Sequence, residues 1–202
     1  MILPHIDPSK LVGHNADGSP YTGRVTRTGR FLDVLHPDPD QIDIEDIAAG
    51  LGYQPRFTGQ MSEFYSLADH SILVSFLVPP ELALQGLLHD AAEAYVNDIP
   101  RPVKPLLRDY KPIEETIGQA IMLRYGLSLP LAKEVKDADA VAVGIEQFLF
   151  LPNTPYWPHI FTASEVDSIF RRISFHIADF DTIGPEPGRR AFLRRFEELY
   201  DV

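Results

Sequence analysis

The stretch Gly86-Leu-Leu-His-Asp-Ala-Ala-Glu-Ala-Tyr-Val-Asn-Asp98 places ionisable side chains in what is otherwise an apolar helix and its exit loop. Apolar spacing predicts that this helix runs over residues 81–95. His89 and Glu93 are four residues apart and share a helix face, and Asp90 lies three residues before Glu93. We expect these side chains at the edge of the core, where a divalent cation would compensate for their burial. A solvated acidic face is the alternative.

Further helices follow from apolar spacing, capping residues and prolines, and no alternation typical of strands interrupts them. Their expected ranges are 41–51, 67–78, 112–125, 130–150, 164–177 and 187–200. The predicted fold class is therefore all-α. Residues 1–40 are rich in Gly, Pro, Asp and Thr, which predicts loops or short strand pieces. We interpret them as an irregular N-terminal arm of the same domain that residues 41–202 form.

His70 is a second candidate ligand, in the first turn of the helix predicted over residues 67–78. Pro79-Pro80 joins this helix to the next one, so the two should pack antiparallel, with the start of one beside the end of the other. That packing would bring His70 to His89 and Asp90. A capping or core histidine is the alternative.

Asp139 interrupts the apolar stretch Ala138-Asp-Ala-Val-Ala-Val143, where an ionised carboxylate is unfavourable unless a cation accompanies it. Asp137 is its rival, but the row of apolar residues favours Asp139 as the inward group. Glu146 lies seven residues further on and shares a face with Asp139. It either supports a ligand from behind or is exposed.

Composition limits the kinds of site and partner. The 202 residues include no cysteine, so His and carboxylates are the only strong metal ligands. The formal net charge of -11 argues against binding a nucleic-acid polymer. The apolar runs are shorter than a membrane helix needs, and the first residues lack the pattern of a signal peptide. We therefore expect a cytoplasmic protein that does not bind membranes.

The pattern of His70, His89-Asp90 and Asp139 resembles that of the HD superfamily of metal-dependent phosphohydrolases, and the resemblance covers residues 30–150. It is carried by Ser66-Leu-Ala-Asp-His-Ser-Ile-Leu-Val-Ser75, Leu88-His-Asp-Ala-Ala-Glu-Ala-Tyr95, Asp98-Ile-Pro-Arg-Pro-Val-Lys104 and Asp137-Ala-Asp-Ala140. These segments look like the branch of bacterial 5′-deoxynucleotidases and phage deoxynucleoside triphosphohydrolases. The resemblance implies an HD-domain helical bundle.

The resemblance also implies one divalent metal ion (Co, Mn, Zn, Mg, Ni or Fe) bound by His70, His89, Asp90 and Asp139. Glu93 would position or deprotonate the attacking water, and Asp98, which matches a second catalytic carboxylate of the branch, would hold the sugar or the leaving oxygen. Metal-activated water would then attack phosphorus and release the nucleoside as an alcohol.

In that branch an arginine ahead of the first ligand histidine holds phosphate, and Arg56 lies at a comparable distance before His70. Its planar guanidinium suits phosphate, although a surface salt bridge is the alternative. Arg101 and Lys104 are weaker phosphate candidates, since they could equally belong to a solvated loop. Phe57 could stack on a base or pack in the core.

We therefore expect an enzyme that acts on a deoxynucleotide, either a dNMP 5′-nucleotidase or a dNTP triphosphohydrolase, and that forms a homo-oligomer. A non-catalytic nucleotide-sensing HD module is one alternative, which the loss of Glu93 or Arg56 would have favoured. A phosphodiesterase of a signalling nucleotide is another. It would need a second set of ligating histidines, and His159 and His176 lie too far from the helical motif to supply one.

Overall fold

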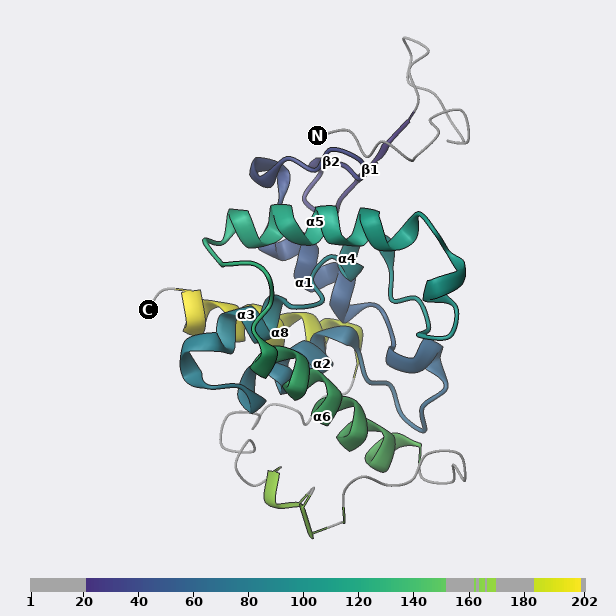
Figure 1. Ribbon diagram of the computed structural model, residues 1–202, viewed down its shortest axis with the longest axis vertical. Coiled ribbons are helices and arrows are strands. Elements are labelled where there is room, and N and C mark those ends of the chain that lie inside the picture. The colour runs from purple at the N-terminus through teal and green to yellow at the C-terminus, as the bar shows by residue number, and fades with distance from the viewer. Residues whose placement is uncertain (1–20, 152–161, 163, 166, 170–183, 201–202) are drawn as a thin grey trace.

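The structure is a computed structural model that describes residues 21–151, 162, 164–165, 167–169 and 184–200 (Figure 1). Helices dominate these residues, as predicted. The strands among them form one antiparallel pair, β1 (Gly23–Val25) and β2 (Phe31–Asp33). The described part of the chain is therefore mostly helical, with a small hairpin at one end.

Five longer helices correspond to predicted ones, with ends shifted by a few residues. They are α1 (Ile44–Gly52), α2 (Leu67–Leu77), α5 (Tyr110–Arg124), α6 (Lys133–Phe150) and α8 (Pro185–Tyr200). Short 3-10 turns lie between them: η2 (Pro39–Gln41), η3 (Arg56–Gly59), η4 (Pro80–Leu82) and η5 (Lys104–Leu106). Of the helix predicted over residues 164–177, residues 164–165 and 167–169 are helical. The rest of it, with His159, His176 and residues 1–20, lies outside the described residues.

A capping box fixes where α2 begins, and so where His70 lies. The Ser66 side chain accepts from the backbone N–H of Asp69 at 3.1 Å, and the Asp69 carboxylate accepts from the backbone N–H of Ser66 at 2.8 Å. Both bonds satisfy N–H groups that have no partner within the helix. His70 follows in the first turn, as predicted.

The prediction of one continuous helix over residues 81–95 is wrong. The chain forms α3 (Ala83–Leu88), loses the α-helical hydrogen-bond pattern after Leu88, and resumes as the short α4 (Glu93–Val96). In between, the N–H of Glu93 donates to the carbonyl of Asp90 at 2.9 Å, a tighter i→i−3 pattern. The ring of His89 bonds the Gly86 carbonyl at 2.8 Å, and this carbonyl is the one that Asp90 would use in a continuous α-helix. The side chain therefore competes with the backbone where the helix breaks.

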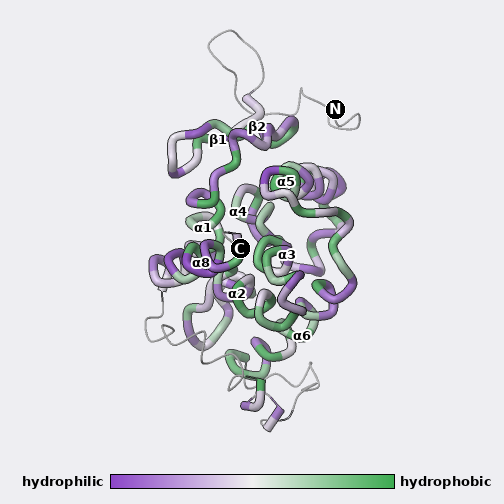
Figure 2. Tube along the Cα trace, turned by 90° about the vertical axis from the view of Figure 1, so that its left-hand side faces the viewer, coloured by the Kyte–Doolittle hydropathy of each residue, from purple (hydrophilic) through white to green (hydrophobic). Residues whose placement is uncertain are grey.

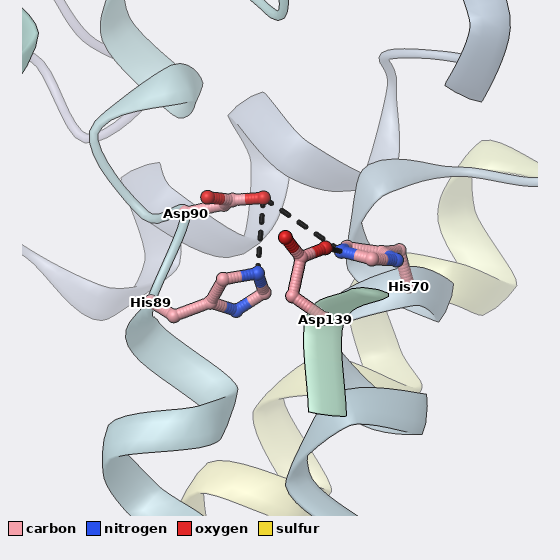
Figure 3. A group of neighbouring side chains, drawn as sticks. All are labelled: His70, His89, Asp90 and Asp139. Atoms are coloured by element: carbon pink, nitrogen blue, oxygen red, sulfur yellow. Dashed lines mark ion pairs between the residues drawn. The ribbon is translucent and has the colours of Figure 1, made fainter. Parts of the chain in front are cut away.

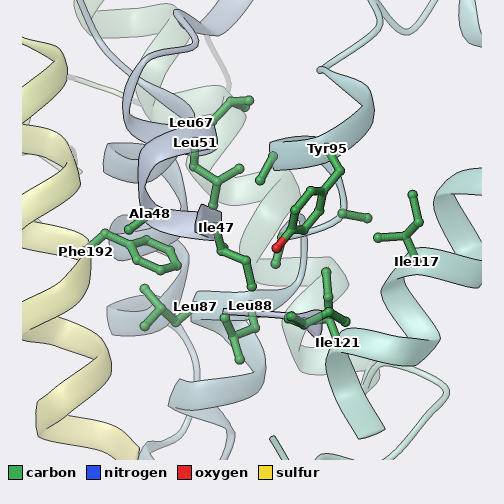
Figure 4. Packing of buried hydrophobic residues seen from close by; sticks show 14 of the residues in the cluster. Ile47, Ala48, Leu51, Leu67, Leu87, Leu88, Tyr95, Ile117, Ile121 and Phe192 are labelled. Carbon is green, nitrogen blue, oxygen red and sulfur yellow. The ribbon is translucent and has the colours of Figure 1, made fainter. Parts of the chain in front are cut away.

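The main core lies among α1, α2, α3, α4, α5 and α8 (Figure 4). Phe192 of α8 faces α1 and α3, while Ile117 and Ile121 of α5 close the opposite side next to Tyr95. Figure 2 shows α3 in the interior and coloured as largely hydrophobic, with hydrophilic segments of α8 and α5 at the periphery. Burial of this apolar surface is the main force that holds α3 in place.

A second apolar cluster joins α6 to α2 and α3. Its members are Leu73, Val74, Val78, Ala83, Val135, Ala138, Ala142 and Ile145. Ala138 and Ala142 are small, so α6 can approach α2 closely on this face. This packing brings Asp139 next to the start of α2.

The N-terminal hairpin is attached to the helical body. Leu32 of β2 is fully buried in the main core, and the guanidinium of Arg24 donates to the carbonyl of Tyr95 at 2.7 Å. The backbone N–H of Thr28 donates to Asp46 of α1 at 2.8 Å. Within the described residues, no helix is long and apolar enough to cross a membrane.

Candidate metal centre

Four side chains from distant parts of the chain converge on one point (Figure 3). His70 comes from α2, His89 and Asp90 from the turn that follows α3, and Asp139 from α6. One nitrogen or oxygen atom of each lies within 4.8 Å of the others. The structure therefore brings together all four residues predicted as metal ligands.

The carboxylate of Asp90 lies between the two imidazole rings (Figure 3). Its Oδ2 is 3.0 Å from His89 Nε2 and 3.7 Å from His70 Nε2. Asp139 Oδ1 approaches His70 Nε2 to 3.2 Å. Both histidine rings are almost fully buried, whereas about 30% of each aspartate side chain is exposed. The cluster can therefore be reached from solvent on the carboxylate side.

Each imidazole ring is held in place by a hydrogen bond at its Nδ1 atom. His70 Nδ1 is 2.6 Å from the carboxylate of Glu146, and His89 Nδ1 is 2.8 Å from the Gly86 carbonyl. Since both partners accept hydrogen bonds, the proton of each neutral ring lies on Nδ1, and Nε2 carries a lone pair. Neither Nε2 atom has a hydrogen-bond partner. Two lone pairs thus face two carboxylates.

This arrangement fits a divalent cation. Two imidazole nitrogens and two carboxylates form a donor set that suits Zn, Mn, Fe, Co or Ni, and a carboxylate behind a ligating histidine is a common supporting contact. Without a cation, the buried donors would repel one another. His70, His89, Asp90 and Asp139 could therefore hold a metal ion.

The charges of the cluster are strongly coupled. Burial disfavours ionisation of Asp139, but the neighbouring imidazole of His70 outweighs burial and holds the pKa of Asp139 below its usual value. Burial also lowers the pKa of His70, yet the carboxylate of Glu146 opposes this effect and raises the pKa to about 9. In the protein without metal, a proton on His70 therefore balances the carboxylates, and a bound cation would replace it.

Arg56 is buried beside the cluster, so the alternative of a surface salt bridge is wrong. Its Nε and Nη2 donate to Glu146 Oε2 at 3.3 and 3.1 Å, and its Nη1 lies 3.5 Å from Asp98 Oδ2. Glu146 is 0% exposed, so the interpretation of Glu146 as an exposed residue is also wrong. This carboxylate contacts His70 and Arg56 at once, which places the guanidinium next to the candidate ligands.

The backbone beside Arg56 has an unusual conformation. Phe57 and Thr58 have φ angles of 49° and 53°, in the left-handed region that residues with a side chain seldom adopt. The N–H of Arg56 donates to the carbonyl of Tyr65 at 2.8 Å, which ties this turn to the segment before α2. Strained backbone of this kind is frequent near functional groups. Phe57 is partly buried, and the centre of its ring lies 5.3 Å from the Arg56 guanidinium.

Glu93 is buried, and its two oxygens differ. Oε1 accepts from the ammonium of Lys104 at 2.7 Å, whereas Oε2 has no hydrogen-bond partner. Burial and the charges of Asp90 and Asp98 raise the pKa of Glu93 to about 9, although Lys104 opposes them. Lys104 also donates to Glu114 at 3.0 Å, so its charge is shared between two carboxylates.

Two other candidates are exposed to solvent. Arg101 is exposed and is absent from the lining of the pocket described below. Asp137, the rival of Asp139, is 61% exposed and pairs with Lys133 one turn earlier in α6. Glu114 of α5 is a further acidic residue at this site that the sequence did not indicate. Its partner Lys104 lies ten residues away, and no local pattern indicates that pair.

A pocket of about 520 Å³ opens beside the candidate ligands. His89, Asp90, Glu93 and Lys104 line its inner end, and the remainder is formed by α5 and the segment around Leu129–Leu131. This volume is within the range of small-molecule sites, about 300–1,000 Å³. The candidate metal centre therefore adjoins a space large enough for an organic ligand.

Comparison with known proteins gives two relatives. The chain is 39% identical over 182 residues to the uncharacterized protein YfdR of Escherichia coli K12, a match that spans 88% of this chain and 95% of YfdR. An uncharacterized protein of Rhodobacter capsulatus is 37% identical over 133 residues, which cover 59% of this chain and 68% of that protein. No family model matches. The chain belongs to the protein family of YfdR.

Proposed function

We propose that this protein is a metal-dependent phosphohydrolase of the HD superfamily that cleaves the 5′-phosphate ester of deoxynucleotides, as a dNMP 5′-nucleotidase or a dNTP triphosphohydrolase. One observation carries the proposal: two buried imidazole nitrogens with no hydrogen-bond partner face two carboxylates, and a buried Glu93 and a buried Arg56 lie beside them. The motifs that resemble those of the HD superfamily support the same activity. Cytoplasmic location and homo-oligomeric assembly stay predictions.

The chemistry divides between the ion and the side chains. A bound divalent ion would polarise the phosphoryl group and lower the pKa of a water molecule. The charge of a bound cation would also favour the ionised form of Glu93, and the carboxylate then takes the proton of the attacking water on Oε2, the oxygen that has no hydrogen-bond partner. Lys104 holds the other oxygen and so fixes the orientation of the carboxylate.

Arg56 provides positive charge for the phosphate. Glu146 engages its Nε and Nη2, and Nη1 lies 3.5 Å from Asp98 Oδ2. Nη1 therefore retains a donor for a phosphate oxygen, and Asp98 holds the sugar or the leaving oxygen on the same side. A guanidinium fixed in this way loses little conformational entropy when it binds a phosphate.

The direct test is phosphate release. The protein, loaded in turn with Co²⁺, Mn²⁺, Mg²⁺ or Zn²⁺, is incubated with deoxynucleoside monophosphates and triphosphates, and the products are identified as phosphate or triphosphate. Metal-dependent release from at least one class is expected. Binding of these nucleotides without release of phosphate or triphosphate from any of them would contradict the proposed enzymatic activity and favour a nucleotide-sensing module.

The variant Glu93→Gln separates catalysis from metal binding. We expect it to retain the metal ion and to lose about 100-fold or more in kcat, because the amide cannot take up the proton. The control is Glu134→Gln, an exposed residue of α6. An unimpaired kcat in Glu93→Gln would remove this residue from the mechanism.

A further inference from the structure

The pocket beside the candidate metal centre extends along one face of α5. Its inner end contains Asp90 and Glu93, so a phosphate held there would leave the rest of its molecule in the pocket. Gln85 fixes the opposite wall, because it donates to the Ser128 carbonyl and accepts from the Ala132 N–H, both at 2.9 Å. The space is therefore bounded by elements that the fold already holds in place.

Gly118 lies in the middle of α5 and lines this pocket. Glycine inside a helix is unfavourable, so its presence calls for a reason. Packing does not supply one, because a Cβ atom at Gly118 would have no atom within 4 Å. By contrast, a Cβ at Gly50 of α1 would lie 2.5 Å from the carbonyl oxygen of Ala94. At Gly118 the missing side chain instead leaves the pocket wide.

The charges of the lining disfavour additional phosphate groups. Acidic side chains outnumber lysines, and Lys104 already pairs with Glu93 and Glu114. Lys136 is the other lysine of the lining, at the exposed rim. Beyond the inner end, Met122 and Leu129 offer apolar contact, and Gln119 offers an amide that both donates and accepts. This mixture suits a neutral ring system that carries hydroxyl and amino groups.

We infer that this pocket between α5 and the Leu129–Leu131 segment binds the nucleoside part of the substrate, with Gly118 kept small to admit it. The inference rests on the proposed function, since the phosphate of that nucleotide lies at the metal centre. It places the base at α5 and away from Phe57, which does not line the pocket.

A graded series at Gly118 tests this inference. Gly118→Ala adds one methyl group, while Gly118→Leu and Gly118→Phe fill the pocket. The matched control is Leu123→Phe, at an exposed residue of the same helix that does not line the pocket. The metal-loaded variants are assayed with 2′-deoxyadenosine 5′-monophosphate and with glycerol 3-phosphate, which has no base. Binding of 2′-deoxyadenosine alone is measured by calorimetry, and metal content and circular dichroism confirm that each variant is loaded and folded.

We expect Gly118→Phe to lower kcat/KM for the nucleotide by about tenfold or more, mainly through KM, and to leave glycerol phosphate within about twofold. Binding of 2′-deoxyadenosine should be lost in parallel in Gly118→Phe and kept in the control Leu123→Phe. Unchanged nucleotide hydrolysis in Gly118→Phe, or an equal loss for both substrates, would overturn the inference. So would weaker nucleoside binding in Phe57→Ala together with unchanged binding in Gly118→Phe.

The two proposals fail in different ways. If the parent protein binds 2′-deoxyadenosine and Gly118→Phe does not, the pocket assignment stands even where no phosphate is released from any substrate. That result would contradict the phosphohydrolase alone. If phosphate is released but the parent protein does not bind the nucleoside, the pocket assignment is wrong and the activity stands.

Discussion

Glu146 connects the candidate ligands to the candidate phosphate-binding residue. One of its oxygens lies 2.6 Å from His70 Nδ1, and the other accepts two N–H groups of Arg56. Burial opposes ionisation of this carboxyl, but His70 and Arg56 more than offset burial and hold its pKa below the usual value. A single ionised carboxylate therefore sets the position of two functional side chains.

The substitution Glu146→Gln tests this role. The amide oxygen can replace only part of the acceptor capacity, so at least one buried donor is left unpaired. We expect the free energy of unfolding to fall by about 3 kcal/mol and metal affinity to fall by about 10- to 100-fold. Urea denaturation and metal titration measure the two effects, with Glu134→Gln on the same helix as control. Stability and affinity equal to the control would show that Glu146 supports neither residue.

The raised pKa of Glu93 predicts the direction in which the stability of the protein changes with pH. In the protein without metal, the native carboxyl keeps its proton up to a pKa of about 9, whereas the unfolded one releases it near 4.5. Its contribution to stability is therefore complete below the unfolded pKa and lost as the pH rises through the folded one. Glutamine carries no such proton. In chelator-treated protein, Glu93→Gln should gain stability relative to the parent between about pH 5 and about pH 9. A difference in unfolding free energy that does not change with pH would contradict this assignment.

At the scale of elements, the start of α2 was predictable because its signal is local. Ser66 and Asp69 form a capping box within four residues, and His70 follows directly. The break after α3 was not predictable from apolar spacing. It depends on the bond between the His89 ring and the Gly86 carbonyl, which propensity does not describe. His89 and Asp90 were therefore correctly placed in a cluster that could hold a metal ion, but they were assigned to the wrong local structure.

Two glycines inside helices should respond in opposite ways to alanine. At Gly50 the added carbon would lie 2.5 Å from the carbonyl oxygen of Ala94, so α1 and α4 would have to separate, at a cost of about 1–3 kcal/mol. At Gly118 nothing lies within 4 Å, so alanine should stabilise α5 by about 0.5–1 kcal/mol. Thermal unfolding of Gly50→Ala and Gly118→Ala compares them. A change of the same sign in both would contradict the packing of α1 on α4 or the open space at α5.

At the scale of the whole molecule, the candidate site is assembled from segments far apart in the sequence. Residue chemistry could select Asp139, an ionisable group in an apolar stretch, and the Pro79-Pro80 link between two predicted helices could select His70. The contacts of Glu114 with Lys104 and of Glu146 with Arg56 could not be derived, since they depend on how whole helices cross. The pocket along α5 could not be derived either, because Gly118 looks like any other glycine in the sequence.

The central claim is a metal ion held by His70, His89, Asp90 and Asp139, and the paired aspartates of α6 test it most directly. The metal content of the parent protein, Asp139→Ala and Asp137→Ala is measured after equilibrium dialysis against Co²⁺, with circular dichroism as the check on folding. The account predicts one ion per chain in the parent and in Asp137→Ala, and loss of that ion in Asp139→Ala. A parent that binds no ion, or a folded Asp139→Ala that keeps it, would contradict the account.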